Sequence, residues 1–264
     1  MVIDSPVVAL HNLTVSYRQH PALHHISGVF AAGSLTAVVG PNGSGKSTLL
    51  KAVMGLVPTS GGSVSVSVPP ERIAYLPQLA EIDRSFPMDV QDCVLLGCWP
   101  IYGAWRGVGE VQMQSIHAAL ANVGLQGFEN RTLSSLSSGQ LQRVLFARLL
   151  VQDADLILLD EPFNAMDSKT VTSLLATIDA WHRQQRTVVA VLHDDAQVRE
   201  HFPQTVLLAR ELIDWGPTAR VMTEQRLASA RQMAEAWDDE AGLCDIDTVA
   251  SAQIAAQKRL AQAI

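Results

Sequence analysis

The sequence lacks the features that would place the chain across a membrane or on a nucleic acid. Its first residues have no basic stretch leading into an apolar core, and no run of about 18 apolar residues occurs, so neither a signal peptide nor a transmembrane helix is expected. The formal net charge is -7, which argues against a nucleic-acid backbone as the main partner, because such binding depends on Lys and Arg. Only three cysteines are present, which fits a reducing compartment, and Cys93 and Cys98 are expected to be packing residues. We therefore expect a cytosolic chain that another protein can tether.

The hydrophobic content and the order of local patterns predict an α/β fold. With 264 residues, 48% of them hydrophobic, the chain can bury the core of one large domain or two smaller ones. Strands are expected at residues 7–18, 25–30, 35–39, 63–68, 72–77, 156–159, 187–192 and 206–208, with 207–210 and 212–215 as a closing pair. Helices are expected after residue 48, from 90, over 110–123, after 134–138, over 168–184, after 194 and from 223 onward. This alternation predicts a mainly parallel sheet preceded by an antiparallel N-terminal β region.

Residues 79–151 contain few strand signals and are interpreted as an inserted helical subdomain. Within it, a glycine-containing segment at residues 97–109 carries four large apolar residues: Trp99, Ile101, Tyr102 and Trp105. Such a segment is either a core plug or an exposed patch for a partner, and the glycines favour the partner. Residues 225–264 are expected to form a helical C-terminal tail that packs on the core or on a second subunit, or else frays.

A phosphate-binding loop is predicted between the strand at 35–39 and the helix that follows it. Gly40, Gly45, Lys46 and Ser47 satisfy the pattern G-x-x-x-x-G-K-S. The glycines let backbone N–H groups turn toward an anion, the lysine supplies charge for the β- and γ-phosphates, and the serine hydroxyl can hold Mg²⁺. An ordinary glycine-rich turn is the alternative, which the strand before and the helix after the loop disfavour. The candidate nucleotide-binding residues are Gly40, Pro41, Asn42, Gly43, Ser44, Gly45, Lys46, Ser47 and Thr48.

Polar side chains follow two further predicted strands. The apolar run 156–159 ends in Asp160 and Glu161, and the run 187–192 ends at His193. Strands of an open α/β sheet deliver such residues to the edge where ligands bind. Asp160 is therefore expected to hold Mg²⁺, Glu161 to polarise the attacking water, and His193 to contact the γ-phosphate or that water. Each signal is weak by itself, because strands often end in an acid or a structural histidine, but together with the phosphate loop they are specific.

The motifs in this order resemble those of the ATP-binding subunits of ABC transporters over residues 7–224. The phosphate loop is similar to their Walker A, Gln78 to their Q-loop glutamine, and Asp160-Glu161-Pro162 to their Walker B and catalytic glutamate. Residues 136–140 (LSSGQ) resemble their signature, residues 164–167 (NAMD) their D-loop, and His193 their switch histidine. The resemblance assigns residues 1–224 to an ABC-type ATP-binding domain.

The resemblance also implies roles for individual residues. Periodicity alone favours strand packing for Tyr17, whereas the family places an adenine-stacking aromatic there. ATP and Mg²⁺ are the implied cofactors, with Mg²⁺ held by Ser47, Gln78 and Asp160. Two subunits would face head to tail, each signature contacting the partner's ATP. The implied signature and D-loop residues are Ser137, Ser138, Gly139, Gln140 and Asp167.

Two positions depart from the family pattern. Ser138 stands where the family usually has glycine, and Asn164 where the D-loop usually opens with serine. The added Ser138 side chain is expected to weaken the closed dimer slightly, because a helix N-terminus must approach phosphate closely there. Ser137, Gly139 and Gln140 are kept, so activity is expected to survive.

Finer features resemble the manganese, zinc and iron-chelate importers, most of all the zinc importers. They lie at residues 75–78, 128–131 and 215–219. Such a subunit would sit at the cytoplasmic face of the inner membrane and work with a transmembrane permease, indirectly with a periplasmic or extracellular metal-binding protein, and not with nucleic acid. A manganese or iron-chelate importer is the alternative, and a soluble ABC ATPase acting on DNA or ribosomes is the alternative class. Three early histidines are interpreted as solvated loop residues rather than a zinc site: His20, His24 and His25.

Overall fold

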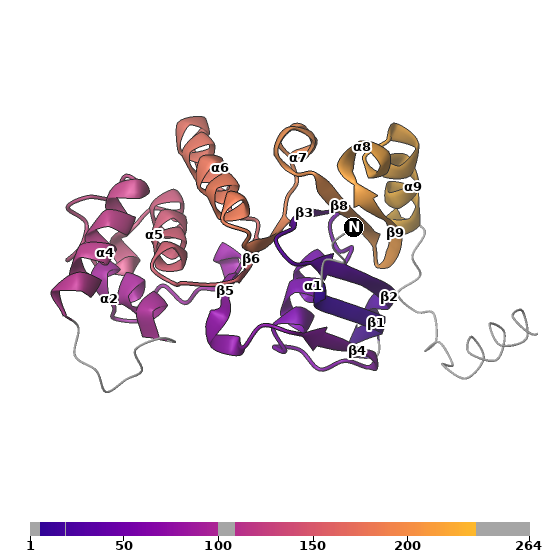
Figure 1. Cartoon of the computed structure of the whole chain (residues 1–264), viewed down its shortest axis with the longest axis horizontal. Coiled ribbons are helices and arrows are strands. Elements are labelled where there is room, and N and C mark those ends of the chain that lie inside the picture. The colour runs from indigo at the N-terminus through magenta and orange to yellow at the C-terminus, as the bar shows by residue number, and fades with distance from the viewer. Residues whose placement is uncertain (1–5, 19, 100–108, 236–264) are drawn as a thin grey trace, which may run out of the picture.

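A computed structural model describes residues 6–18, 20–99 and 109–235 (Figure 1). Its main sheet has six strands in the order β5-β6-β7-β3-β8-β9. Neighbours from β5 to β8 are parallel, and β9 is antiparallel to β8. The strands are β3 (Leu35–Val39), β5 (Ile73–Leu76), β6 (Leu156–Asp160), β7 (Thr187–Val191), β8 (Gln204–Ala209) and β9 (Glu211–Pro217). Every residue of β3, β6 and β7 is buried, as expected for central parallel strands made of continuous apolar runs.

A second sheet is formed by the N-terminal part of the chain. It consists of β1 (Pro6–Tyr17), β2 (His20–Ala31) and β4 (Gly61–Val66), paired antiparallel in the order β2-β1-β4. Helix α1 (Lys46–Val53) packs in one core cluster with residues from both sheets, including Leu10 of β1, Leu49 and Leu50 of α1 and Leu158 of β6. The start of α1 is therefore fixed between two sheets. This architecture confirms the predicted mainly parallel sheet and antiparallel N-terminal region.

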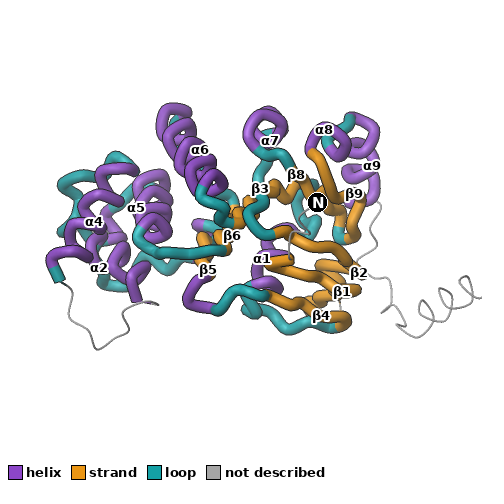
Figure 2. The backbone as a smooth tube through the Cα atoms, viewed as in Figure 1, coloured by secondary structure: helices purple, strands orange, loops and turns teal. Residues whose placement is uncertain are grey.

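The described residues between β5 and β6 form a lobe of helices. The helices of this segment are a 3-10 helix (Leu79–Glu81), α2 (Val90–Leu95), a second 3-10 helix (Leu96–Cys98), α4 (Glu110–Asn122), a third 3-10 helix (Leu133–Ser135) and α5 (Ser138–Leu150). Figure 2 shows this lobe at the opposite end of the molecule from the antiparallel sheet. Its core contains Val94, Ile116 and Leu145, which are all buried. The predicted helices at 110–123 and after 134–138 are confirmed.

The remaining helices follow the second half of the main sheet. They are α6 (Ser168–Arg183), α7 (Asp195–His201), α8 (Thr218–Val221) and α9 (Glu224–Glu235). Helix α9 packs on the core through Ala230, which is buried, and Leu227, which is partly buried. The rest of the expected tail, from 236 to 264, lies outside the described residues. Within the described ranges, no helix has the length and apolar character needed to cross a membrane.

Several local predictions need correction. Strand β4 begins at Gly61 and ends at Val66, and Arg72 belongs to the 3-10 helix Pro70–Arg72, which follows a proline-rich turn unsuited to a strand. His20, His24 and His25 lie in strand β2, not in a loop. Cys93 and Cys98 are buried, which confirms their packing role, whereas Cys244 lies outside the described residues.

Candidate active site

The strand order of the main sheet brings the predicted motifs to one edge. Strands β5, β6, β7 and β3 are consecutive neighbours, so the segments after their carboxyl ends are neighbours too. These segments carry Gln78, Glu161, His193 and the phosphate loop, in that order across the sheet. Residues that are more than a hundred positions apart in the sequence therefore line one cavity.

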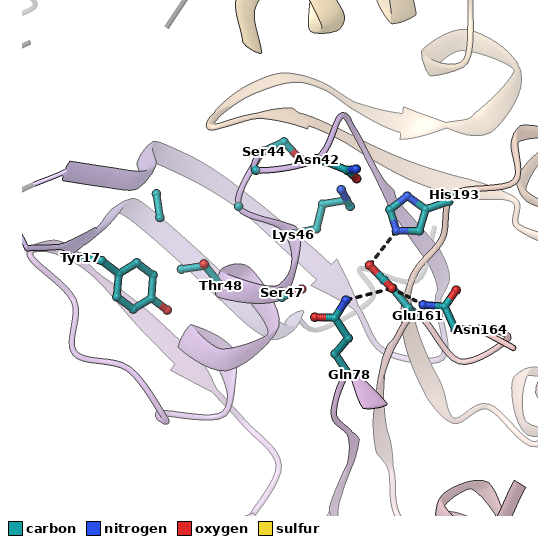
Figure 3. A pocket seen from close by; sticks show the side chains of 13 residues that line it. Tyr17, Asn42, Ser44, Lys46, Ser47, Thr48, Gln78, Glu161, Asn164 and His193 are labelled. Atoms are coloured by element: carbon teal, nitrogen blue, oxygen red, sulfur yellow. Dashed lines mark hydrogen bonds and ion pairs between the residues drawn. The ribbon is translucent and has the colours of Figure 1, made fainter. Parts of the chain in front are cut away.

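That cavity has a volume of about 780 Å³ and is open to solvent. Figure 3 shows Tyr17 at one end and His193 at the other, with the phosphate loop between them. Tyr17 ends β1 and is 47% exposed, which leaves its ring accessible to a ligand. The lining residues are Tyr17, Ala22, Asn42, Gly43, Ser44, Gly45, Lys46, Ser47, Thr48, Gln78, Glu161, Asn164 and His193. Gly40 and Pro41 instead line a smaller neighbouring cavity of about 170 Å³.

The phosphate loop requires glycine where neighbouring backbone crowds it. A Cβ at Gly40 would lie 2.1 Å from the carbonyl oxygen of Leu208 in β8. A Cβ at Gly45 would lie 2.3 Å from the carbonyl oxygen of Ala22 in β2, and Gly45 has φ 91°. The loop is therefore packed closely against both sheets. A side chain at Gly40 or Gly45 would clash with neighbouring backbone, and Gly45 also has the left-handed conformation that favours glycine.

Lys46 is folded back on its own loop. Its Nζ donates to the carbonyl oxygens of Gly40 and Pro41 at 3.0 and 2.9 Å, and the residue is only 6% exposed. Burial lowers the pKa of Lys46, while Glu161 and Asp160 oppose that shift. A buried ammonium group whose hydrogen-bond partners are neutral carbonyl oxygens is suited to bind the anionic oxygens of a polyphosphate.

Ser47 and Asp160 form an oxygen pair that fits Mg²⁺. The Ser47 hydroxyl donates to Asp160 Oδ1 at 3.0 Å, and Asp160 is fully buried. Asp160 Oδ2 is buried and has no hydrogen-bond partner among the described residues, although buried carboxylate oxygens are normally paired. Burial raises the pKa of Asp160 to about 6. An unpaired carboxylate oxygen beside a hydroxyl is the donor set that Mg²⁺ prefers, and Gln78 lies between Ser47 and Glu161 (Figure 3).

The Asp160→Asn variant is expected to be more stable than the wild type without nucleotide and to be inactive. A carboxyl pKa of about 6 instead of 3.8 means that ionised Asp160 lowers the free energy of unfolding, by on the order of 3 kcal/mol above pH 6. The penalty is absent below pH about 4, where folded and unfolded carboxyls are both protonated, and grows as the pH rises to 6. Urea unfolding of both proteins at pH 4 and pH 8 measures the difference in their free energies of unfolding. A difference of the same size at the two pH values would contradict the prediction.

Glu161 accepts hydrogen bonds from three segments of the chain. Gln78 Nε2 donates to its Oε2 at 3.0 Å, Asn164 Nδ2 donates to the same oxygen, and His193 Nε2 lies 2.7 Å from Oε1. Burial acts to raise the pKa of Glu161, but these three contacts outweigh it and lower the pKa. Glu161 is therefore an ionised acceptor at neutral pH, beside the phosphate loop. Its backbone has φ 51°, a conformation uncommon for a residue with a side chain.

The signature residues and Asp167 of the D-loop do not line the cavity of their own chain, although Asn164, which opens the D-loop, does. Ser137 Oγ accepts from the N–H of Gln140 and Gln140 Oε1 accepts from the N–H of Ser137, which caps helix α5. Gly139 packs on the D-loop, since a Cβ there would lie 2.4 Å from the carbonyl oxygen of Ala165. Asp167 caps α6 by accepting from the N–H of Thr170. A single chain therefore leaves these residues outside the nucleotide cavity.

Three side chains make contacts at or near the site that the sequence motifs did not predict: Ser138, Asn164 and Gln142. Ser138 Oγ accepts a hydrogen bond from the Arg84 guanidinium. Asn164, which the sequence marks only as a departure from the family pattern, donates a hydrogen bond to Glu161. Gln142 is fully buried in α5, with Nε2 3.3 Å from the carbonyl oxygens of both Glu161 and Pro162. The sequence does contain a signal for Gln142, because a glutamine among the apolar residues 141–149 of a helix indicates a buried polar side chain that needs hydrogen-bond partners.

The sequence and the fold both resemble those of known proteins. The sequence profile of the family described as ABC transporter matches residues 23–164. The manganese transport system ATP-binding protein of Listeria monocytogenes is 38% identical over 226 residues, covering 84% of this chain and 94% of the relative. The zinc transport system ATP-binding protein of Treponema pallidum is 38% identical over 228 residues, covering 84% and 86%. A solved transporter described as metal-chelate type, in an inward-facing conformation, is 29% identical with TM-score 0.74, covering 86% of this chain and 90% of that one.

Proposed function

This chain belongs to the ABC transporter family of ATP-binding proteins, and from that premise we propose that it is the ATP-hydrolysing subunit of an importer for a transition-metal ion. The observation that carries the proposal is the position of Glu161, which is ionised, held by His193 and Gln78, and placed beside the phosphate loop. Family membership implies ATP hydrolysis.

Each residue along the cavity would have its own role in binding or hydrolysing ATP. Tyr17 would stack on the adenine base, and the loop N–H groups together with Lys46 would hold the phosphates. Ser47 and Asp160 would hold Mg²⁺, which when bound offsets negative charge on the phosphates. Glu161 would accept a proton from the attacking water, and His193 would orient Glu161 through their contact.

A second copy of the chain would complete the site. The signature residues Ser137, Ser138 and Gly139 sit at the N-terminus of α5 and do not line their own cavity. A helix N-terminus that presents free N–H groups suits the γ-phosphate of a nucleotide bound by another copy. We therefore propose a head-to-tail homodimer that closes on ATP and opens after hydrolysis, with Asp167 near the interface.

The proposed cargo is zinc or manganese, with an iron chelate as a further alternative. The two relatives named for these metals are equally identical to this chain, and the detailed resemblance of residues 128–131 and 215–219 favours zinc. The cargo would cross through a separate permease, supplied by a periplasmic or extracellular binding protein, with this subunit at the cytoplasmic face of the inner membrane.

Deleting the gene tests the cargo. Growth in chelator-treated medium should fail and should be rescued by the transported ion, and a plasmid copy carrying Glu161→Gln should not restore it. Rescue by zinc alone would support the zinc assignment, and rescue by manganese alone would replace it. Normal growth under limitation of all three metals, with the chain in ribosomal fractions, would contradict the proposal.

The Trp99→Glu variant is expected to lose assembly with the permease while keeping ATP binding. Trp99 follows the 3-10 helix Leu96–Cys98 in the helical lobe and is 54% exposed, an unusual position for a tryptophan in a monomer. A charge there would have to be desolvated in an apolar contact. The other aromatics of the proposed patch, Tyr102 and Trp105, lie outside the described residues.

Co-purification with the permease measures this effect. Val29→Glu is the matched control, because Val29 is 53% exposed and lies on β2, outside the helical lobe. Retention of the permease by the Trp99 variant, or equal loss in both variants, would contradict a specific contact.

A further inference from the structure

Glu161 is held by a hydrogen-bond donor that the family motifs do not supply. Gln78 and His193 correspond to family motifs, whereas Asn164 stands where the family usually has serine. The Asn164 amide lies against Glu161 Oε2 on the side away from Gln78 (Figure 3). A serine hydroxyl is one bond closer to the backbone and has a shorter reach.

The three donors use most of the acceptor capacity of the carboxylate. Each carboxylate oxygen offers about two lone-pair sites. Oε2 accepts from both Gln78 and Asn164, so its sites are filled, and Oε1 is engaged by His193. A water that is to be deprotonated must donate to one of these oxygens. Oε2 cannot accept that water while Asn164 occupies it.

The backbone of Glu161 is fixed, so only side chains can release this arrangement. Gln142 Nε2 lies 3.3 Å from the carbonyl oxygens of Glu161 and Pro162, and the N–H of Asn164 donates to the carbonyl oxygen of Glu161 at 3.3 Å. Asn164 itself is exposed, in a turn whose next residue, Ala165, has φ 60°. A contact at this exposed turn can therefore displace Asn164 without moving the sheet.

We propose that Asn164 is a positioning residue that withholds Oε2 of Glu161 from water in the single subunit and releases this oxygen when a second copy of the chain docks on the D-loop. The inference rests on the proposed function, because it presumes ATP hydrolysis at this cavity. Its consequence is a slower hydrolysis by the subunit before it pairs than Oε1 and Oε2 together would permit, which limits ATP consumption without transport.

The test compares Asn164→Ala, Asn164→Ser and Asn164→Gln in the full chain, at saturating ATP with Mg²⁺ and at a protein concentration where single subunits predominate. The Ala and Ser variants should raise kcat by about two- to tenfold, the change that the net free energy of one hydrogen bond produces, with KM for ATP unchanged within about twofold. The Gln variant keeps an amide donor on a longer side chain and should raise kcat less than the Ala and Ser variants. Asn130→Ser, in an exposed loop after α4, is the control and should change neither constant.

Unchanged or lower kcat in both the Ala and Ser variants, with wild-type nucleotide affinity, would overturn the inference, and so would an equal rise in the Gln variant. A purely structural role predicts a lower unfolding temperature and a higher KM, which the same samples reveal. If the wild type shows no ATPase activity and Glu161→Gln changes nothing, the proposed function fails instead. An active wild type that Glu161→Gln inactivates, with no effect of Asn164, rejects this inference alone.

Discussion

The Glu161→Gln variant should bind ATP normally but hydrolyse it about a hundred- to a thousandfold more slowly than the wild type, because a neutral amide cannot accept the proton of the attacking water. Glutamine has the shape of glutamate, and its amide oxygen can still accept from Gln78 or Asn164. Nucleotide affinity should change little, since Glu161 is expected to contact the water and not to hold the phosphates. Single-turnover hydrolysis and equilibrium nucleotide binding separate the two effects.

The same variant should accumulate as an ATP-bound dimer. If hydrolysis opens the proposed head-to-tail pair, a subunit that binds ATP without cleaving it stays closed, and light scattering should show a doubled mass with ATP and Mg²⁺ but not with ADP. Glu81→Gln is the matched control. Glu81 pairs with Lys51 at the surface, and such pairs contribute little, so hydrolysis and mass should remain those of the wild type. A monomer at saturating ATP would contradict the dimer proposal.

The Lys46→Ala variant should lose about ten- to a hundredfold in ATP affinity, the range expected for one hydrogen bond to a charged group. Lys46 is the only lysine or arginine that lines the described cavity, and burial lowers its pKa. Removing Lys46 deletes a charge held in a poorly solvated position. The unfolding temperature of the variant without nucleotide should therefore not fall, whereas its affinity for ATP should.

Calorimetric titration with a non-hydrolysable ATP analogue measures this loss. Lys51→Ala, one turn further along α1, is the control, because Lys51 faces Glu81 and does not line the cavity. A variant at Lys46 with wild-type affinity would show that backbone N–H groups suffice for the phosphates. A variant with a much lower unfolding temperature would show that Lys46 is mainly structural.

The local motifs were predictable from sequence because each depends on neighbouring residues. The β-branched run 35–39 followed by glycines and a helical pattern defines a phosphate loop without reference to the rest of the chain. The apolar run before Asp160 similarly predicts a buried strand that ends in a carboxylate, and β6 ends at Asp160. Strand limits in half-exposed segments were less accurate, as β4 shows, because packing against another sheet decides them.

Distances between motifs were not predictable in this way. Gln78, Glu161 and His193 converge because β5, β6 and β7 are adjacent, an order that the sequence does not state. The bonds from Asn164 and Gln142 to Glu161 depend on the turn after β6 and on the packing of α5 against it. Pairwise geometry of this kind arises only when the core is closed.

The sequence by itself determined the family, the α/β class and the residue types at the phosphate loop, since these follow from short patterns and their order. Only the tertiary structure decided that Glu161 accepts from three donors, that Asp160 Oδ2 is buried without a partner among the described residues, and that the signature lies outside its own cavity. The physical reason is that hydrogen-bond partners and burial are properties of segments brought together in space, whereas local propensity acts along the chain.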